Sequence, residues 1–250
     1  MKEAISIDWH HEASLRIAWM KDVLAKSGTK GYVLGLSGGK DSAVVAALAR
    51  QATENVLGVL LPCQSAHTDR DDALRLAEHF HIATMEINLE PAFLAARSSM
   101  HTELGALDPM AEANIKPRLR MLTLYAVAQT RGLLVAGTSN RSERAMGYFT
   151  KWGDSGCDIS PIADLTVREV LLLGAALGVP DDLLLKPPSA GLWPGQTDEQ
   201  EMGIRYDAID EYLLHGQATE QDRTLIERAY NRSEHKRSGV LFYRQMDKLP

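Results

Sequence analysis

Apolar and polar residues follow two alternating patterns along the chain. Short, largely apolar segments predict buried strands at residues 31–36 and 56–61 and further strands at residues 82–89 and 133–137. Longer segments with apolar residues three or four positions apart predict helices at residues 12–26, 42–51, 69–80, 114–131, 166–177 and 198–214. Loops are expected at residues 146–161 and 186–197. Because strands and helices alternate, the predicted fold class is α/β, a doubly wound parallel sheet with helices on both faces.

The composition argues against several classes of protein. Of the 250 residues 45% are apolar, which is enough for one full core or two small ones. The net charge of −6 gives no sign of a nucleic-acid coat or a polybasic membrane anchor, so neither nucleic acid nor a membrane is an expected partner. The longest apolar segment, residues 170–179, is about half as long as a bilayer-spanning helix. Two distant cysteines, Cys63 and Cys157, and charged residues near the N-terminus favour a soluble, cytoplasmic protein.

The sequence VLGLSGGKDS, residues 33–42, carries the clearest functional signal. It lies between the first predicted strand and the helix that follows, at the edge of the sheet where ligands of open α/β folds bind. Gly35, Gly38 and Gly39 allow a sharp turn and a close approach of the backbone to a ligand. Because free N–H groups at the start of a helix attract anions, the loop has the features of a phosphate site.

Four interpretations of this loop compete. A kinase-type P-loop requires a glycine in place of Leu34 and a hydroxyl residue in place of Asp41, so the sequence departs from it twice. The order G-x-S-x-G of a hydrolase nucleophile elbow is present, but such an elbow normally follows several strands and this loop follows the first. A plain strand–helix turn capped by Asp41 is the structural alternative. Residues 37–42, SGGKDS, match in full the loop of enzymes that cleave ATP between its α and β phosphates.

Asp41 indicates that a metal ion accompanies the phosphates. A carboxylate is repelled by a polyphosphate unless a cation lies between them, and Mg²⁺ commonly binds one or two carboxylates together with phosphate oxygens. Glu143 is the candidate second ligand, because it follows the fourth predicted strand and so reaches the same edge of the sheet. The alternative for Glu143 is a solvated acid in the first turn of a helix.

Seven segments, in order, resemble the ammonia-dependent NAD⁺ synthetase family. They extend over about two hundred residues: GLSGGKDS, ANIKPRLRM, LLVAGTSNRSE, GYFTKWGDSGCDISPI, KPPSAGLWPGQTDEQEMG, YDAIDEYL and SEHKR. Each is modestly specific alone, whereas all seven in register are highly specific. The resemblance implies an adenine nucleotide α-hydrolase-like, Rossmann-like fold, a single synthetase domain over residues 1–250, and a homodimer.

The resemblance also implies the reaction and the residues of its site. In this family the carboxylate of deamido-NAD⁺ attacks ATP to form an acyl-adenylate, and ammonia then displaces AMP to give NAD⁺. The residues implied to bind ATP are Gly35, Leu36, Ser37, Gly38, Gly39, Lys40, Asp41, Ser42, Thr138 and Ser189. Asp41 and Glu143 are implied to hold Mg²⁺ and to act in catalysis. The residues implied to bind deamido-NAD⁺ are Arg118, Lys151, Asp158, His235 and Lys236.

One residue departs from the family pattern. Val167 occupies the place where relatives commonly carry a lysine that contacts ATP, and Arg168 points about 100° away from it on a helix. Since a valine cannot donate a hydrogen bond to a phosphate, a non-catalytic nucleotide sensor stays an alternative. A tRNA-thiolating or GMP-forming enzyme with a similar loop is another, although a tRNA enzyme is expected to show a basic face and paired cysteines.

The nitrogen source follows from the position of the first motif. The synthetase segments begin within about thirty residues of the start, which leaves no room for a glutaminase domain. We therefore expect free ammonia, or ammonia delivered by a separate glutaminase, as the second substrate.

Overall fold

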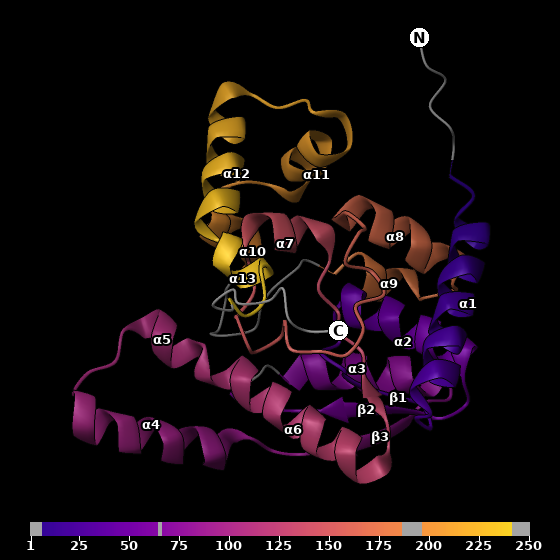
Figure 1. The fold of residues 1–250 in the computed structure, drawn as a ribbon, viewed down its shortest axis with the longest axis horizontal. Coiled ribbons are helices and arrows are strands. Elements are labelled where there is room, and N and C mark those ends of the chain that lie inside the picture. Colours follow the sequence, from indigo (N-terminus) through magenta and orange to yellow (C-terminus); the bar gives the residue numbers. More distant parts are fainter. Residues whose placement is uncertain (1–6, 65–66, 187–196, 242–250) are drawn as a thin grey trace, which may run out of the picture.

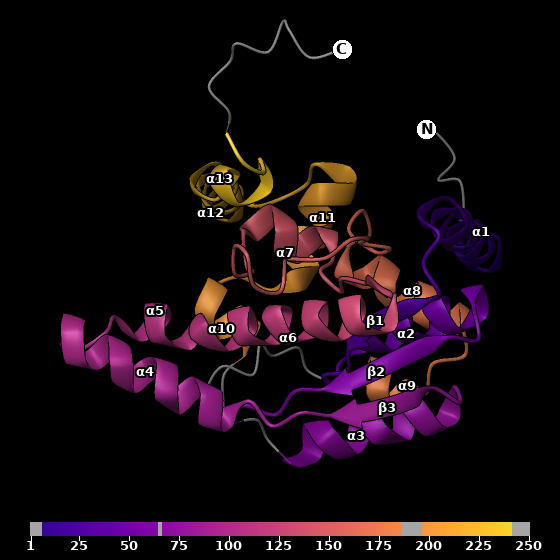
Figure 2. The ribbon, with the colours of Figure 1, turned by 60° about the horizontal axis from the view of Figure 1, so that its bottom comes forward.

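A four-stranded parallel sheet forms the centre of the computed structural model, which describes residues 7–64, 67–186 and 197–241 (Figures 1 and 2). The sheet order is β3-β2-β1-β4, with β1 paired in parallel to both β2 and β4. All four predicted strands are present, each somewhat shorter than its apolar run. Their bounds are β1 (Tyr32–Gly35), β2 (Val56–Leu60), β3 (Ala83–Glu86) and β4 (Leu134–Val135).

Helices cover both faces of this sheet, which confirms the predicted doubly wound class. Alternate residues of a strand point to opposite faces, and the two faces belong to separate cores. Tyr32 and Leu34 pack against α1 (Trp9–Ser27), α2 (Lys40–Ala52), α3 (His67–His79) and α8 (Val167–Ala176). Val33 packs instead with α4 (Glu90–Leu104) and α6 (Ile115–Arg131).

Small side chains let α2 lie close to the sheet. Its sequence is rich in alanine and valine, and ten of its thirteen residues are buried. A helix that is buried on nearly all sides holds its first turn in a fixed place, which matters because the predicted phosphate loop leads directly into it. Tyr32, in the same core, ties α1 to the sheet, since its hydroxyl donates to the carbonyl of Met20 at 2.7 Å.

The C-terminal helices form a third cluster above the carboxyl edge of the sheet (Figure 1). Ile209 and Ile226 are its most buried residues. The continuous helix predicted over 198–214 is wrong: Gly203, at φ +70°, ends one helix, and a second begins at Tyr206. The remaining helices are α5 (Pro109–Ala113), α7 (Arg141–Met146), α9 (Asp181–Leu184), α10 (Asp198–Met202), α11 (Tyr206–His215), α12 (Glu220–Arg232) and α13 (Glu234–Arg237).

The order of the strands determines where a ligand can bind. From β1 the chain continues to β2 and β3 on one side and later returns to β4 on the other, so the direction of winding reverses beside β1. Ligands of such folds bind at this reversal, beyond the carboxyl ends of the strands. The loop after β1 and the loop after β4 both lie there. No helix among the described residues is long and apolar enough to cross a bilayer.

Candidate active site

The loop after β1 is held in shape by its own two serines. The Ser37 and Ser42 hydroxyls are 3.0 Å apart, Ser42 Oγ donates to the Gly39 carbonyl at 2.9 Å, and the Gly39 N–H donates to Ser37 Oγ at 3.3 Å. Gly39 is the N-cap of α2 and has no side chain to satisfy the first N–H groups of that helix. These groups and the helix dipole together favour a phosphate at this end of α2.

Gly38 is the residue of the loop for which a side chain is excluded. Its φ of +74° lies in the left-handed region. A Cβ added there would also lie 2.4 Å from the carbonyl oxygen of Asp69, in the first turn of α3. The loop therefore turns tightly against α3, and only glycine meets both requirements.

A large cavity opens beside this loop. Its volume is about 1440 Å³, which exceeds the usual 300–1,000 Å³ of a single drug-sized ligand site. Its walls include residues 35–37 and 39–42, residues 135–139 after β4, and residues 146–150 after α7. Asp198 of α10 and Arg228 of α12 close it from the C-terminal cluster. There is room for more than one nucleotide-sized ligand.

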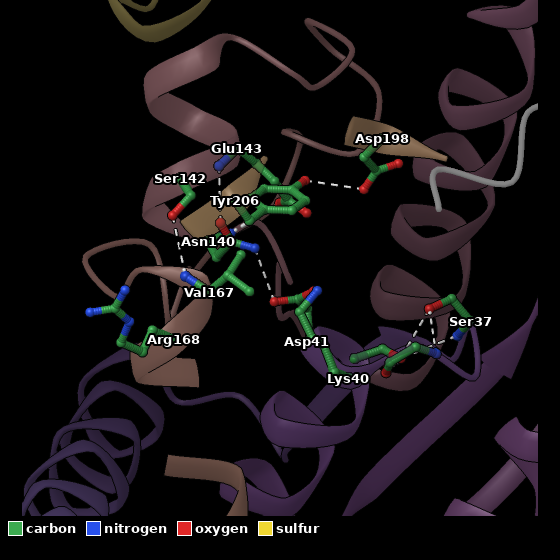
Figure 3. A network of polar contacts seen from close by, with 12 residues as sticks. Ser37, Lys40, Asp41, Asn140, Ser142, Glu143, Val167, Arg168, Asp198 and Tyr206 are labelled. Atoms are coloured by element: carbon green, nitrogen blue, oxygen red, sulfur yellow. Dashed lines mark hydrogen bonds and ion pairs between the residues drawn. The ribbon is translucent and has the colours of Figure 1, made fainter. Parts of the chain in front are cut away.

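Asp41 and Glu143 reach this cavity from different crossover connections, and Asn140 joins them (Figure 3). Asn140 is the fully buried N-cap of α7. Its Nδ2 donates to Asp41 Oδ1 at 3.1 Å, and its backbone N–H donates to Glu143 Oε2 at 3.1 Å. The carboxylates predicted from sequence are thus brought together, and each has an oxygen bound to the same residue.

Lys40 lies beneath these acids. Its side chain is only 4% exposed, and its ammonium is 3.0 Å from Asp41 Oδ2 and 5.7 Å from the centre of the Tyr206 ring. Burial opposes the charge of Lys40, but the carboxylates of Asp41, Glu143 and Asp198 outweigh it and raise its pKa. Lys40 is predicted to bind ATP as part of the loop; it lines the cavity, and its ammonium contacts a carboxylate of the site.

The electrostatics of Glu143 favour the arrival of a cation. Burial, and then the nearby negative charge of Asp41, raise the pKa of Glu143 well above its usual value. Asp198 adds a third carboxylate to this field and accepts a hydrogen bond from the Tyr206 hydroxyl at 3.1 Å. Two neighbouring carboxylates are costly to ionise together unless a positive charge lies between them.

The pair fits Mg²⁺ by its chemistry. Both side chains offer hard carboxylate oxygens, and Mg²⁺ is usually held by one or two carboxylates and completed by phosphate oxygens and water. Among the described residues, no group of three or more His, Cys, Asp or Glu side chains has the arrangement of a complete metal site. The residues of this site can therefore hold Mg²⁺ together with a nucleotide, rather than as an all-protein cage.

The residues predicted for the dinucleotide lie on the segment after α7, on α6 and at the C-terminal end. Arg118 is exposed and donates to the Lys151 carbonyl at 3.3 Å, while Lys151 Nζ donates to the carbonyl of the exposed His235 at 2.5 Å. None of these three lines the cavity, whereas Arg120, two residues further along α6 and so on nearly the opposite side of that helix, does.

Two of the predicted dinucleotide ligands are engaged within the protein. Lys236 Nζ donates to the carbonyls of Gly147 and Phe149, both at 2.8 Å, so it ties α13 to the segment after α7. Asp158 accepts from the Val135 N–H at 2.8 Å and from the Tyr125 hydroxyl at 3.1 Å. Both residues thus have a structural contact, and Lys236 also lines the cavity.

Thr138 and Ser189 are the two residues outside the phosphate loop that are predicted to bind ATP. Thr138 lines the cavity directly after β4. Ser189, and most of the predicted loop over 186–197, lie outside the described residues.

Val167 is buried beside the site but contributes no charge. It packs in the third cluster with Met146 and Tyr206, and its N–H donates to Ser142 Oγ at 3.2 Å. Arg168 does not take the place of a phosphate-binding lysine, because its guanidinium points away from Asp41 and pairs with Glu211 at 3.4 Å (Figure 3).

Sequence reasoning missed Asn140, Asp198 and Arg120. The pattern N-x-x-E at residues 140–143 was available as a cap signal, in which an asparagine precedes a glutamate three positions on. For Asp198 and Arg120 no local signal distinguishes a residue that faces a cavity from one on a solvated helix surface.

The SGGKDS loop at the winding reversal of a doubly wound sheet, with two carboxylates on adjacent connections, defines a ligase of the ATP-pyrophosphatase loop class. The profile of the NAD synthase family matches residues 12–240. This chain belongs to that family.

Individual relatives agree with this assignment. The NH(3)-dependent NAD(+) synthetase of Carboxydothermus hydrogenoformans is 42% identical over 92% of this chain and 96% of that protein. The structure of NMN synthetase from Francisella tularensis has a TM-score of 0.91 and 39% identity, covering 95% of this chain and 99% of its own. The NH3-dependent NAD synthetase of Campylobacter jejuni has a TM-score of 0.77 and 27% identity, covering 96% and 100%.

Proposed function

We propose that this protein amidates the nicotinate carboxyl group of deamido-NAD⁺ with ammonia, using ATP and releasing AMP and pyrophosphate. The observation that carries the proposal is the convergence of Asp41 and Glu143 on one cavity, beside the phosphate loop and joined by Asn140. Membership of the NAD synthase family supplies the substrate class.

The protein's part in the reaction is mainly alignment and neutralisation of charge. The loop from Gly35 to Ser42 and Thr138 bind ATP so that its α-phosphate faces the substrate carboxylate. Holding two reactants in line can lower the barrier by about 7–11 kcal/mol. When bound, Mg²⁺ supplies positive charge that stabilises the phosphate oxygens of the leaving pyrophosphate, and Asp41 and Glu143 are the residues that hold it. The substrate's own carboxylate is the nucleophile, so no protein nucleophile is required.

Deamido-NAD⁺ is bound by the residues on α6, on the segment after α7 and on α13. Arg118, Lys151 and His235 are adjacent on the surface, and Lys236 and Asp158 lie on the same segments. The positive charges of Arg118, Lys151 and Lys236 attract an anionic dinucleotide locally although the whole chain carries a charge of −6. Ser189 is kept as an ATP ligand on the family resemblance.

A homodimer is part of the proposal. Large apolar side chains are exposed on α4 and α6, with Leu104 at 71% and Leu122 at 62%. Exposed apolar surface of this kind is typical of a protein–protein interface. Size-exclusion chromatography with light scattering tests this: the wild type should have twice the mass of one chain, and Leu122→Glu should shift it toward the monomer. A wild-type monomer at micromolar concentration would contradict the dimer.

A second candidate substrate is nicotinate mononucleotide, the corresponding amidation acceptor with a single nucleotide unit. The observation that favours it is the TM-score of 0.91 with the Francisella tularensis protein, whose name describes a synthetase of NMN. Both candidates share the same phosphate loop, carboxylates and acyl-adenylate chemistry. They differ only in the length of the acceptor.

Steady-state turnover with both acceptors tests these proposals. Purified protein is supplied with ATP, Mg²⁺ and ammonium, and AMP release is measured with deamido-NAD⁺ and with nicotinate mononucleotide. A larger kcat/KM for deamido-NAD⁺ supports the first candidate, and the reverse supports the second. No AMP release with either acceptor would favour a nucleotide sensor, and AMP release that depends on tRNA would overturn both.

The proposal also covers the domain organisation, the location and the nitrogen source of the protein. We propose a single synthetase domain that acts in the cytoplasm and uses free ammonia or ammonia from a separate glutaminase. Replacing ammonium by glutamine in the turnover assay should remove activity from the isolated protein. Equal rates with glutamine would contradict this proposal.

A further inference from the structure

Asn140 makes one contact more than its role as a helix cap requires. As the N-cap of α7 its Oδ1 accepts from the Glu143 N–H at 3.0 Å, and Glu143 Oε2 accepts from the Asn140 N–H at 3.1 Å. These two bonds complete a capping box. The third bond, from Asn140 Nδ2 to Asp41 Oδ1 at 3.1 Å, lies outside the helix and reaches the phosphate loop.

The hydrogen bonds determine which way the amide of Asn140 points. A backbone N–H can only donate, so the atom that faces Glu143 N must be the amide oxygen. The amide nitrogen then faces Asp41 and donates to its carboxylate. Serine or threonine at this position can cap the helix but has no second polar group that could donate a hydrogen bond to Asp41. Aspartate would place a negative charge against Asp41. Asparagine is therefore suited to both tasks at once.

The bridge acts on two acids that repel each other. Asp41 Oδ1 is bound by Asn140 and Asp41 Oδ2 by Lys40 Nζ at 3.0 Å, so the Asp41 carboxylate is held on both sides. One oxygen of Glu143 is held by the same asparagine. Asn140 is fully buried, and its backbone is fixed between β4 and α7. The separation and orientation of the two carboxylates are thus tied to one rigid residue.

We propose that Asn140 is a positioning residue that holds Asp41 and Glu143 at the spacing needed to share a divalent cation. The proposal rests on the proposed function only in taking these two acids as the metal pair. Residues that orient metal ligands typically change metal affinity or activity by about 10- to 100-fold when they are replaced. We expect an effect of that size from the loss of the bridge alone.

Substitutions can separate the bridge from the cap. Asn140→Ser and Asn140→Thr keep an S/T-x-x-E capping box but remove the donor to Asp41, and threonine restores part of the lost volume. Asn140→Ala removes both. Asp8→Ala is the matched control, because Asp8 caps α1 through the N–H groups of His10 and His11 and does not line the cavity.

The readouts are Mn²⁺ binding and the Mg²⁺ dependence of turnover. Mn²⁺ binding is followed by electron paramagnetic resonance with a non-hydrolysable ATP analogue present, so it does not require catalysis. The expected result is a 10- to 100-fold weaker Mn²⁺ affinity for both Asn140→Ser and Asn140→Thr, and a matching rise in the Mg²⁺ concentration for half-maximal rate. Their melting temperatures should fall no further than that of Asp8→Ala.

Two results would overturn the proposal. Wild-type Mn²⁺ affinity in both Asn140→Ser and Asn140→Thr, with a loss only in Asn140→Ala, would reduce Asn140 to a helix cap. An equal loss of Mn²⁺ affinity in Asp8→Ala would assign the effect to general destabilisation. If the Mn²⁺ result holds while neither nicotinate nucleotide is amidated, the positioning role stands and only the proposed function fails.

Discussion

Lys40→Met tests whether the buried ammonium is what allows the acidic site to form. Lys40 is 4% exposed and Asp41 is 17% exposed, with 3.0 Å between Nζ and Oδ2. At an effective dielectric constant near 20, the gross attraction across that distance is about 5 kcal/mol. Removing one partner of a buried pair typically costs about 3–5 kcal/mol, because the other charge is left uncompensated. We expect the free energy of unfolding of Lys40→Met to fall by about 3 kcal/mol, near the lower end of this range, because Asp41 also borders the cavity.

The loss should be visible as a lower melting temperature. For a chain of this size about 1 kcal/mol corresponds to about 2–4 °C, so Lys40→Met should melt about 6–12 °C below the wild type. Differential scanning calorimetry at pH 7, without nucleotide or divalent cation, gives this value. The control is Lys26→Met, whose ion pair with Asp22 is exposed and contributes at most about 1 kcal/mol.

The pH dependence has a definite sign. The pKa of Lys40 is raised, so its stabilising charge is fully present below the ordinary lysine pKa and is lost only as the pH rises through the raised value. Between pH 5 and 7 it therefore stays charged in the wild type. Burial and Asp41 raise the pKa of Glu143, and removing Lys40 raises it further. In the variant, Glu143 can then take up a proton on acidification. The difference in melting temperature between Lys40→Met and the wild type should therefore be smaller at pH 5 than at pH 7.

A double variant tests whether Lys40 stabilises the protein by neutralising the nearby carboxylates. In a Glu143→Gln background one of the charges that Lys40 neutralises is absent, so Lys40→Met should cost at least about 1 kcal/mol less than in the wild type. The electrostatic explanation is wrong if Lys40→Met melts within 2 °C of the wild type. It is also wrong if the fall in melting temperature caused by Lys40→Met is the same at pH 5 as at pH 7 and the same in the Glu143→Gln background as in the wild type.

Three further substitutions test other parts of the structure. Asp41→Asn should still fold, with a lowered melting temperature because the buried Lys40 loses its nearest carboxylate, but it should remove Mg²⁺-dependent AMP release; wild-type kinetics would refute the metal assignment. Gly38→Ala should raise the Kd for ATP, measured by titration calorimetry, by about tenfold or more. The φ of Gly38 is +74°, and an added Cβ would lie 2.4 Å from the carbonyl oxygen of Asp69 in α3. Asp210→Ala should lower the free energy of unfolding by about 1–3 kcal/mol, since the buried carboxylate accepts from the Arg168 N–H at 2.7 Å at the start of α8; an unchanged urea midpoint would contradict that.

A control for the glycine prediction is available at Gly28. Its φ is +68°, and a Cβ there would meet no atom within 4 Å. Gly28→Ala therefore introduces the backbone strain without the collision, at the end of α1 and outside the cavity lining. If Gly28→Ala weakened ATP binding as much as Gly38→Ala, general destabilisation would explain both results.

Local sequence determined most of the framework of this protein. Apolar runs located β1, β2 and β4, because a strand buried on both faces must be apolar throughout, whereas β3 is an exposed edge strand with a mixed sequence. The SGGKDS segment identified the phosphate loop, since glycine conformation and free N–H groups are properties of adjacent residues. Asp41 and Glu143 could be paired in advance because each lies in the segment after the carboxyl end of a strand of a parallel sheet.

Tertiary structure decided the contacts among residues far apart in the chain. Asn140, which joins the two acids, was visible in the sequence only as a helix cap. The break at Gly203 divides a segment whose apolar spacing fits one helix, and it brings the Tyr206 hydroxyl against Asp198, which lines the cavity. The charge of the buried Lys40 depends on the carboxylates of Asp41, Glu143 and Asp198, which only folding brings around it. Periodicity and loop chemistry act between neighbours in sequence, whereas burial and charge depend on neighbours in space.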